Sequence, residues 1–110
     1  MLNFALDIFC IYRYTYIVER SNALIFGSFE WTEGNTGHIA RHNVTPDEAE
    51  EACFNSPSVF RGRRNRYFVL GQTDAGRYLT VILEYRPRRT VRVITARDMT
   101  GTERKRYKRR

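Results

Sequence analysis

The stretch RYFVLGQTDAGRYLTVILEYRPRRTVRVITARD, residues 66–98, contains three segments in which branched or aromatic residues alternate with polar ones. Alternation at a period of two is typical of β-strands, and it runs through residues 66–73, 77–85 and 90–98. The connecting segments TDAG and YRPRR are rich in residues that form tight turns. Consecutive strands joined by short turns predict an antiparallel meander.

A fourth strand is predicted just before this stretch, in SVFRG at residues 58–62, so the sheet is expected to have about four strands. The segment 77–85 places three apolar side chains on one face: Leu79, Val81 and Leu83. The same periodicity predicts that the segment 90–98 places Arg97 on one face with Val91, Val93 and Thr95. The apolar face of such a sheet has to be covered by helices.

Two helices are predicted in the amino-terminal half. The first covers about residues 35–42 and ends at Asn43, a residue type that accepts the left-handed backbone of a helix end. The second begins at Thr45, with Pro46 in its first turn and Glu48 completing a T-x-x-E capping box. Its buried side is predicted to consist of Ala49, Ala52 and Cys53. Helices that pack on one face of an antiparallel sheet make an α+β fold.

A third helix is predicted at the carboxyl end. Thr100 and Glu103 repeat the T-x-x-E pattern and start a basic helix through GTERKRYKRR, residues 101–110. Cations near the end of a helix complement its dipole. For the final KRR, a solvated basic tail is the alternative interpretation.

The charge of the chain is unevenly distributed. The 110 residues fit one domain and carry a net charge of +7, with an isoelectric point of about 9.9. Residues 1–60 hold three basic and eight acidic side chains, whereas residues 61–110 hold sixteen basic and four acidic ones. Most of these cations are arginines, whose planar guanidinium suits bidentate phosphate contacts. The pattern predicts a polyanionic partner for the second half.

The amino-terminal segment MLNFALDIFCIYRYTYIVER is hydrophobic, but it contains Asp7 and Arg13 and lacks the features of a cleaved export signal. We therefore predict no membrane attachment and interpret the segment as an aromatic-rich strand or an extension. Cys10 and Cys53 have no zinc-type or CxxC spacing. Buried, unreactive thiols in a reducing cytoplasmic setting are the expectation.

Residues 29–110 resemble the BrnT family of toxins from bacterial type II toxin–antitoxin modules. The resemblance rests on FEW (29–31), ARHNV with TPDEAEEA (40–52), RYFVLGQTDAGRYLTVIL (66–83) and VRVITARDMTGTERKRY (91–107). The last block is the most specific, since a strand closing in A-R before a capped basic helix ending in Tyr is the family's hallmark. The chain departs from the family at Thr32 and at Asn43. Residues 1–28 lie outside the match and are predicted to be an amino-terminal extension.

The resemblance implies a RelE-like α+β fold and a cytoplasmic ribonuclease that cleaves mRNA and arrests growth. It also implies neutralisation by a cognate BrnA-like antitoxin, in a complex that is oligomeric. A non-catalytic RNA- or ribosome-binding module with the same basic face is the alternative.

The chemistry expected of such an enzyme points to particular side chains. Cleavage without a metal or other cofactor needs a base for the 2′-hydroxyl, cations for the phosphorane and an acid for the leaving 5′-oxygen. His42 is the natural acid or base, since its pKa is ordinarily near neutral. The catalytic candidates are therefore His42, Arg77 and Arg97. The RNA-binding candidates are Arg41, Arg66, Tyr78 and Tyr107.

Each candidate also has a purely structural interpretation. The His42 side chain can bond a carbonyl at a helix end, and Arg77 can be simply solvated. Arg97 can pair with Glu84 or Asp98. His38 and His42 are four residues apart, but the sequence places no third ligand near them, so no metal site is predicted.

Overall fold

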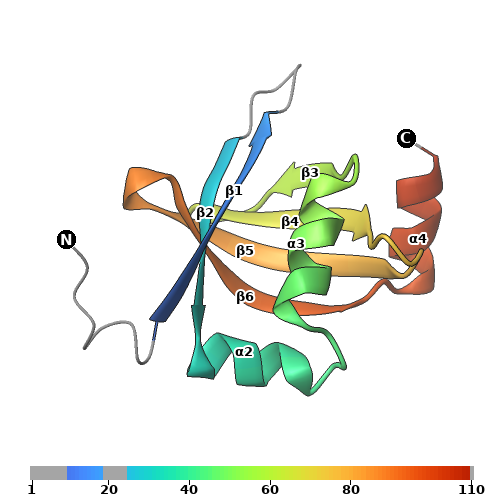
Figure 1. Ribbon diagram of the computed structural model, residues 1–110. Helices are drawn as coiled ribbons and strands as arrows, with labels where there is room; N and C mark the ends of the chain where they lie inside the picture. Colours follow the sequence, from blue (N-terminus) through green and yellow to red (C-terminus); the bar gives the residue numbers. More distant parts are fainter. Residues whose placement is uncertain (1–9, 19–24, 110) are drawn as a thin grey trace.

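The computed structural model describes residues 10–18 and 25–109, and it describes side chains from Ser28 onward (Figure 1). Within that part, three α-helices and one mixed six-stranded sheet form an α+β fold. The sheet has the order β1-β2-β6-β5-β4-β3. The elements along the chain are β1 Cys10–Val18, β2 Ile25–Thr32, α2 Glu33–Ala40, α3 Pro46–Phe54, β3 Ser58–Arg61, β4 Arg66–Gln72, β5 Tyr78–Arg86, the 3-10 turn η1 Pro87–Arg89, β6 Thr90–Asp98 and α4 Gly101–Lys108.

The predicted meander is confirmed, but the predicted number of strands is wrong. Strands β3 to β6 pair antiparallel in sequence order. Beyond them, β2 runs parallel to β6, with Phe29 opposite Val91, and β1 pairs antiparallel with β2. The sheet is therefore mixed rather than a pure meander, and the proposed boundary after residue 28 falls within β2. Periodicity alone did not reveal the parallel pairing, because the two strands are far apart in sequence.

Helices α2 and α3 cover the same face of the sheet (Figure 1). The predicted start of α3 is confirmed, since Thr45 caps the helix and exchanges capping-box hydrogen bonds with Glu48. Helix α2 starts earlier than predicted, at Glu33, because Thr32 and Asn35 form a capping box of their own. The left-handed backbone predicted at Asn43 is confirmed, with a φ of 59°, but the helix itself ends earlier than predicted, at Ala40.

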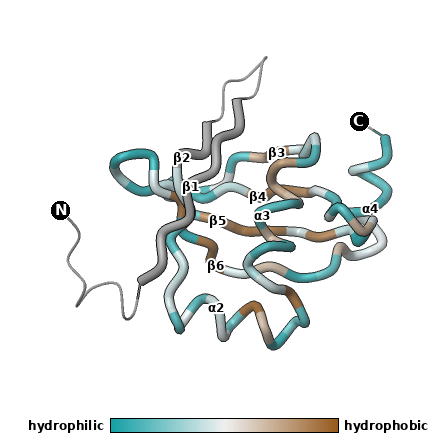
Figure 2. The backbone as a smooth tube through the Cα atoms, in the orientation of Figure 1, coloured by the Kyte–Doolittle hydropathy of each residue, from teal (hydrophilic) through white to brown (hydrophobic). Residues whose placement is uncertain are grey.

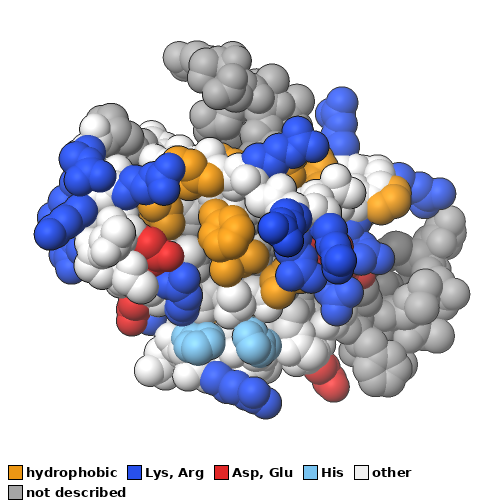
Figure 3. Space-filling view, turned by 180° about the vertical axis from the view of Figure 1, so that it is seen from behind, with side chains coloured by type: hydrophobic (Ala, Val, Ile, Leu, Met, Phe, Trp, Pro, Cys, Tyr) orange, Lys and Arg blue, Asp and Glu red, His pale blue; other side chains and the backbone are white. Residues whose placement is uncertain are grey.

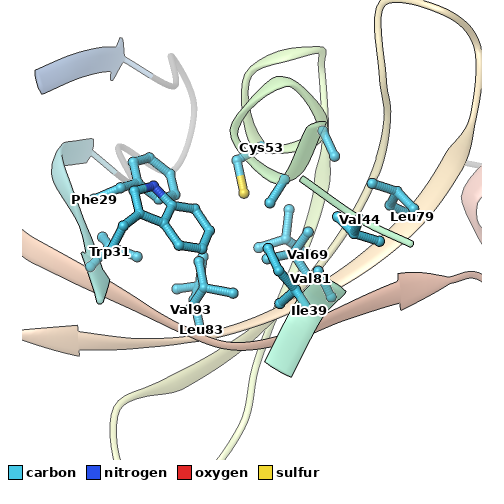
Figure 4. Packing of buried hydrophobic residues seen from close by; sticks show 14 residues of the cluster. Phe29, Trp31, Ile39, Val44, Cys53, Val69, Leu79, Val81, Leu83 and Val93 are labelled. Carbon is cyan, nitrogen blue, oxygen red and sulfur yellow. The ribbon is translucent and has the colours of Figure 1, made fainter. Parts of the chain in front are cut away.

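The core lies between these helices and the sheet (Figure 4). The Phe29 and Trp31 rings stack with centroids 6.4 Å apart, and the indole N–H of Trp31 donates to the buried Glu50 carboxylate at 2.7 Å. The rest of the buried hydrophobic cluster is Ile39, Val44, Ala49, Ala52, Cys53, Val69, Leu79, Val81, Leu83, Val91, Val93 and Ala96. These residues include the predicted buried side of α3 and the predicted apolar face of β5.

Gly71 sets how closely α3 approaches the sheet. A Cβ atom at this position would lie 1.9 Å from the backbone oxygen of Ala52 in α3. No side chain fits in that space, so the contact between α3 and β4 depends on glycine.

A β-bulge in β6 changes which face its last residues occupy. The pairing with β5 shifts between Ile82 and Leu83, so that Ile94 is an extra residue between Val93 and Thr95. An extra residue reverses the alternation of faces beyond it. Ala96 consequently takes the core side, and Arg97 lies on the opposite side from Val91 and Val93. The prediction that Arg97 shares their face is therefore wrong.

Among the residues that Figure 2 colours, hydrophobic ones are concentrated in the central strands, and α4 is mostly hydrophilic. Among the residues the structure describes, there is no helix with the length and hydrophobicity required to span a membrane.

Candidate nucleic-acid interface

We call the face of β3 to β6 that points away from α2 and α3 the open face, and its side chains include three rows that cross the strands. The row under α4 consists of Ser58, Leu70, Thr80 and Arg97. The middle row consists of Phe60, Phe68, Ile82 and Thr95. The far row consists of Arg66, Glu84 and Arg92. Phe68 is 39% exposed, more than any other large hydrophobic side chain in the described part of the chain.

Cations flank the middle of the open face on both sides. Figure 3 shows hydrophobic side chains at the centre, Lys and Arg side chains to the left and right of them, and both histidines along the lower margin. Arg106 of α4 lies over the Phe60 ring, with its guanidinium carbon 4.2 Å from the ring centroid. The surface thus combines positive charge with accessible aromatic area, as single-stranded nucleic-acid sites do.

Helix α4 is fastened to the open face by the carboxylate of Glu103. Arg97 donates to both carboxylate oxygens, at 2.8 and 3.0 Å. The Thr80 hydroxyl and the Thr100 backbone N–H also donate to it, at 2.8 and 2.9 Å. The hydrogen bonds from Arg97, with smaller contributions from Thr100 and Thr80, lower the pKa of Glu103 to about 2. Arg97 therefore has an ionic partner, but the partner is Glu103 rather than Glu84 or Asp98.

The two tyrosines proposed to contact RNA lie together at the base of α4. The Tyr78 and Tyr107 rings meet edge to face with centroids 6.0 Å apart, and Tyr107 is buried. Arg104 and Lys108 lie over the Tyr78 ring, at 4.2 and 5.3 Å from its centroid. An open pocket of 660 Å³ adjoins them, lined by Ser58, Gln72, Tyr78, Tyr107 and Lys108.

Arg77 joins the loop between α2 and α3 to the end of the sheet. Its Nε donates to Asp98 at 2.8 Å, and its terminal nitrogens donate to the backbone oxygens of His42 and Asn43. Glu48 lies 3.4 Å from the same guanidinium. The hydrogen bond to Asp98 raises the pKa of Arg77. Arg77 thus links the α2–α3 loop, helix α3 and the end of β6 through its guanidinium group, and it is not simply solvated.

His42 is exposed immediately after α2. Its backbone is held at both ends, since its N–H donates to Ile39 and its carbonyl accepts from Arg77. The imidazole meets the His38 ring edge to face at 5.8 Å and makes no hydrogen bond within the described residues. The alternative that this side chain bonds a helix-end carbonyl therefore does not apply in the described part of the chain.

The predicted site residues fall into three groups rather than one. Arg41 and His42 lie at the end of α2, with Arg77 behind them. Arg97 and Tyr78 lie beneath α4, and Tyr107 belongs to the buried side of that helix, on the other face of the sheet from Arg77. Arg66 lies at the far end of β4, paired across the sheet with Glu84.

A second pocket near Arg66 contains residues that sequence analysis did not single out. It has a volume of 580 Å³ and is lined by Gly62, Arg63, Arg64, Arg66, Phe68, Ile82 and Ile94. The signal for it was the run RGRRNR at residues 61–66, of which sequence analysis assigned only the two ends, to the strands at 58–62 and 66–73.

The described residues bring no three His, Cys, Asp or Glu side chains together in a group suited to a metal ion. Burial raises the pKa of the Cys53 thiol, in agreement with the prediction of a buried, unreactive cysteine. The side chain of Cys10 lies outside the described part.

The link between α4 and the sheet makes stability depend on pH in a defined direction. We expect Glu103→Gln to lower the free energy of unfolding by about 1 to 2 kcal/mol at pH 7. The pKa of Glu103 is about 2 in the folded protein against an ordinary value of 4.5, so this stabilisation is present above pH 5 and is lost as the pH falls toward 2. Urea melts of parent and variant at pH 7 and pH 3 measure the difference, with Glu33→Gln as an exposed control. A difference as large at pH 3 as at pH 7 would rule out the ion pair as its source.

Comparison with known proteins adds one finding. A family model described as "Ribonuclease toxin, BrnT, of type II toxin-antitoxin system" matches residues 31–103. No curated protein and no solved structure matches the chain. The matched residues run from the core tryptophan of β2 to the carboxylate that fastens α4, and they include α2, α3 and the whole meander.

Proposed function

Because the chain belongs to the BrnT family of ribonuclease toxins of type II toxin–antitoxin systems, we propose that it cleaves messenger RNA held as a single strand across the open face. Cleavage proceeds without a metal ion, takes place in the cytoplasm and arrests growth. The fold is proposed to be RelE-like. The family's activity favours an enzyme over a non-catalytic RNA-binding module with the same basic face.

The open face is supported as the RNA site by arginines that have no acidic partner among the described residues and that lie beside exposed hydrophobic side chains (Figure 3). Arg66, Arg92 and Arg104 form no ion pair with an acidic side chain among the residues described, whereas the acidic side chains of α3 lie on the other face of the sheet. Phosphate binding by such cations is sequence-independent, and bases add affinity by stacking. A single strand supplies both kinds of contact, because its bases are free to stack.

His42 is the proposed acid–base group. Its exposed imidazole lies at the margin of the open face, on a backbone that Arg77 and the end of α2 hold in place. As a base, it takes the 2′-hydroxyl proton while the 2′-oxygen attacks the adjacent phosphorus. The bond to the 5′-oxygen then breaks, and that oxygen takes up a proton. The products are a 2′,3′-cyclic phosphate and a 5′-hydroxyl.

The other candidates have proposed roles that follow from their contacts. Arg77 and Arg97 act mainly as positioning residues, since carboxylates hold both guanidinium groups. Arg41, exposed beside His42, and Arg66, in the far row, bind phosphates. Tyr78 contacts RNA through its edge and through the cations above it, and the buried Tyr107 supports the Tyr78 ring.

A type II toxin has an antitoxin partner. We propose that this partner is BrnA-like, that an acidic segment of it covers the open face, and that the complex is oligomeric. Positive surfaces of this kind are inhibited most simply by a complementary polypeptide laid over them. Co-purification with the product of a neighbouring gene, with restored growth, is the expected result. A neighbouring product that leaves both cleavage and growth arrest unchanged would argue against this assignment.

The function is tested by incubating the purified protein with mRNA in the presence and absence of a chelator. We expect the same cut products in both, ending in cyclic phosphate and 5′-hydroxyl groups. Binding that is sensitive to salt but never yields products would instead support the non-catalytic alternative. Loss of cleavage on adding chelator would overturn the metal-free mechanism alone.

A further inference from the structure

Two turns at the same end of the sheet are built from residues with a left-handed backbone. In the β3–β4 hairpin, Arg64 and Asn65 have φ values of 55° and 62°. In the β5–β6 hairpin, Arg88 and Arg89 have φ values of 64° and 58°. Asn and Gly are the residues that favour such positions, and arginine occupies three of these four at a conformational cost. Strain of this kind is concentrated at sites where a side chain has a task.

The first of these turns borders a pocket. The 580 Å³ pocket, which we call the hairpin pocket, has an apolar floor made by Phe68, Ile82 and Ile94. Its rim is made by Arg63, Arg64 and Arg66. These three arginines form no ion pair with an acidic side chain in residues 28–109, and all three are exposed. The pocket therefore presents free cations around an accessible aromatic ring.

Gly62 shapes the floor of the hairpin pocket. A Cβ atom at this position would lie 3.1 Å from the Phe68 ring and 3.3 Å from the backbone oxygen of Arg66. The glycine lets the ring lie close against the turn and leaves the remainder of the ring exposed.

We propose that the hairpin pocket is a second RNA subsite, which takes one nucleobase on Phe68 and the flanking phosphates on Arg63, Arg64 and Arg66. Stacking on an aromatic ring accepts any base, and arginine binds phosphate oxygens through paired N–H groups. An acidic peptide matches the arginines, but a nucleotide strand matches both the charge and the flat ring. The proposal rests on the proposed function and extends the substrate to a longer single strand.

Because of the position of the hairpin pocket, its contribution to RNA binding should depend on the length of the RNA. Arg77, which holds His42, stands just before β5, and Ile82 on the floor of the hairpin pocket lies five residues further along, roughly 16 Å away along the strand. A dinucleotide cut near His42 does not extend to the hairpin pocket. A longer strand reaches both.

The test compares kcat/KM for two RNAs that share one cleavage site, a dinucleotide and a strand of about 20 nucleotides. The Arg63→Gln, Arg64→Gln double variant is expected to lower kcat/KM on the long RNA about tenfold, with kcat nearly unchanged and no effect on the short RNA. Phe68→Ala is expected to reduce it by about fivefold or more, again only on the long RNA. The matched control is the Arg88→Gln, Arg89→Gln double variant. It removes the same charge from the neighbouring turn, outside the hairpin pocket. It should lower kcat/KM on the long RNA by less than the Arg63→Gln, Arg64→Gln double variant does.

Other outcomes would overturn the subsite. The subsite would be excluded if kcat/KM fell equally on both RNAs. It would also be excluded if kcat/KM fell as much in the matched control, or if it did not fall at all. Variants that bind RNA like the parent but lose the antitoxin would show a protein-docking surface instead. Fluorescence anisotropy with the two RNAs gives a separate readout. If the parent protein cuts neither RNA, the proposed function fails, while a length-dependent loss of affinity in the variants would still support the subsite.

Discussion

His42→Ala is expected to lower the single-turnover rate of RNA cleavage about a hundredfold or more at saturating RNA, while the affinity for RNA changes by no more than about twofold. The imidazole is the group proposed to move the proton, and its removal leaves the backbone contacts with Arg77 and Ile39 in place. The rate is measured in single-turnover reactions at saturating RNA, with folding checked by thermal melts.

His38→Ala is the matched control for this prediction. It removes the same kind of ring, here from the last turn of α2, and the same ring contact at 5.8 Å. It should leave the rate within about threefold of the parent if His42 alone carries the proton. A folded His42→Ala protein that cuts RNA at the parental rate would exclude His42 from the chemistry. A loss as large in the control would indicate that the pair acts together.

Gly71→Ala is expected to lower the free energy of unfolding by about 3 kcal/mol or more. The added methyl group would lie 1.9 Å from the Ala52 oxygen, and the obstacle is the backbone of α3 rather than a flexible side chain. Either α3 moves away from β4 or the strand bends. Thermal melts should show a midpoint lower by roughly 10 to 20 °C.

Gly37→Ala provides the control within α2. A Cβ atom there meets nothing within 4 Å, and alanine is favoured over glycine inside a helix by up to about 1 kcal/mol. This variant should melt at or slightly above the parental temperature. If Gly71→Ala melts like it, the close approach of α3 to β4 does not contribute to stability as described.

Local signals predicted the local structure well. The T-x-x-E patterns at Thr45 and Thr100 correctly located the starts of two helices, because a capping box is made entirely by residues three apart. The four strands of the meander were also found, since turns and alternation lie within a few residues of each other. Thr32 was noted only as a departure from the family, and its role as the cap of α2 depends on Asn35.

Features that depend on distant partners were not predicted. The local alternation of apolar and polar residues shows neither the parallel pairing of β2 with β6 nor the bulge at Ile94. The bulge is the reason that Arg97 points toward α4 and Glu103 instead of toward the core. Arg77 likewise has partners more than twenty residues away in sequence. The candidate residues were chosen by the chemistry of their side chains. That chemistry does not reveal whether an arginine is already paired with a carboxylate in the folded protein.

The position of β6 has a consequence for the order in which the protein assembles during its synthesis. This strand lies between β2 and β5, and the ribosome makes it after both. The β1–β2 ribbon and the β3–β5 hairpins therefore remain two separate pieces of sheet until β6 emerges and joins them, which requires closing a long loop. Helix α4 and the complete open face follow only then. A nascent chain thus lacks the complete open face until β6 and α4 have both been made.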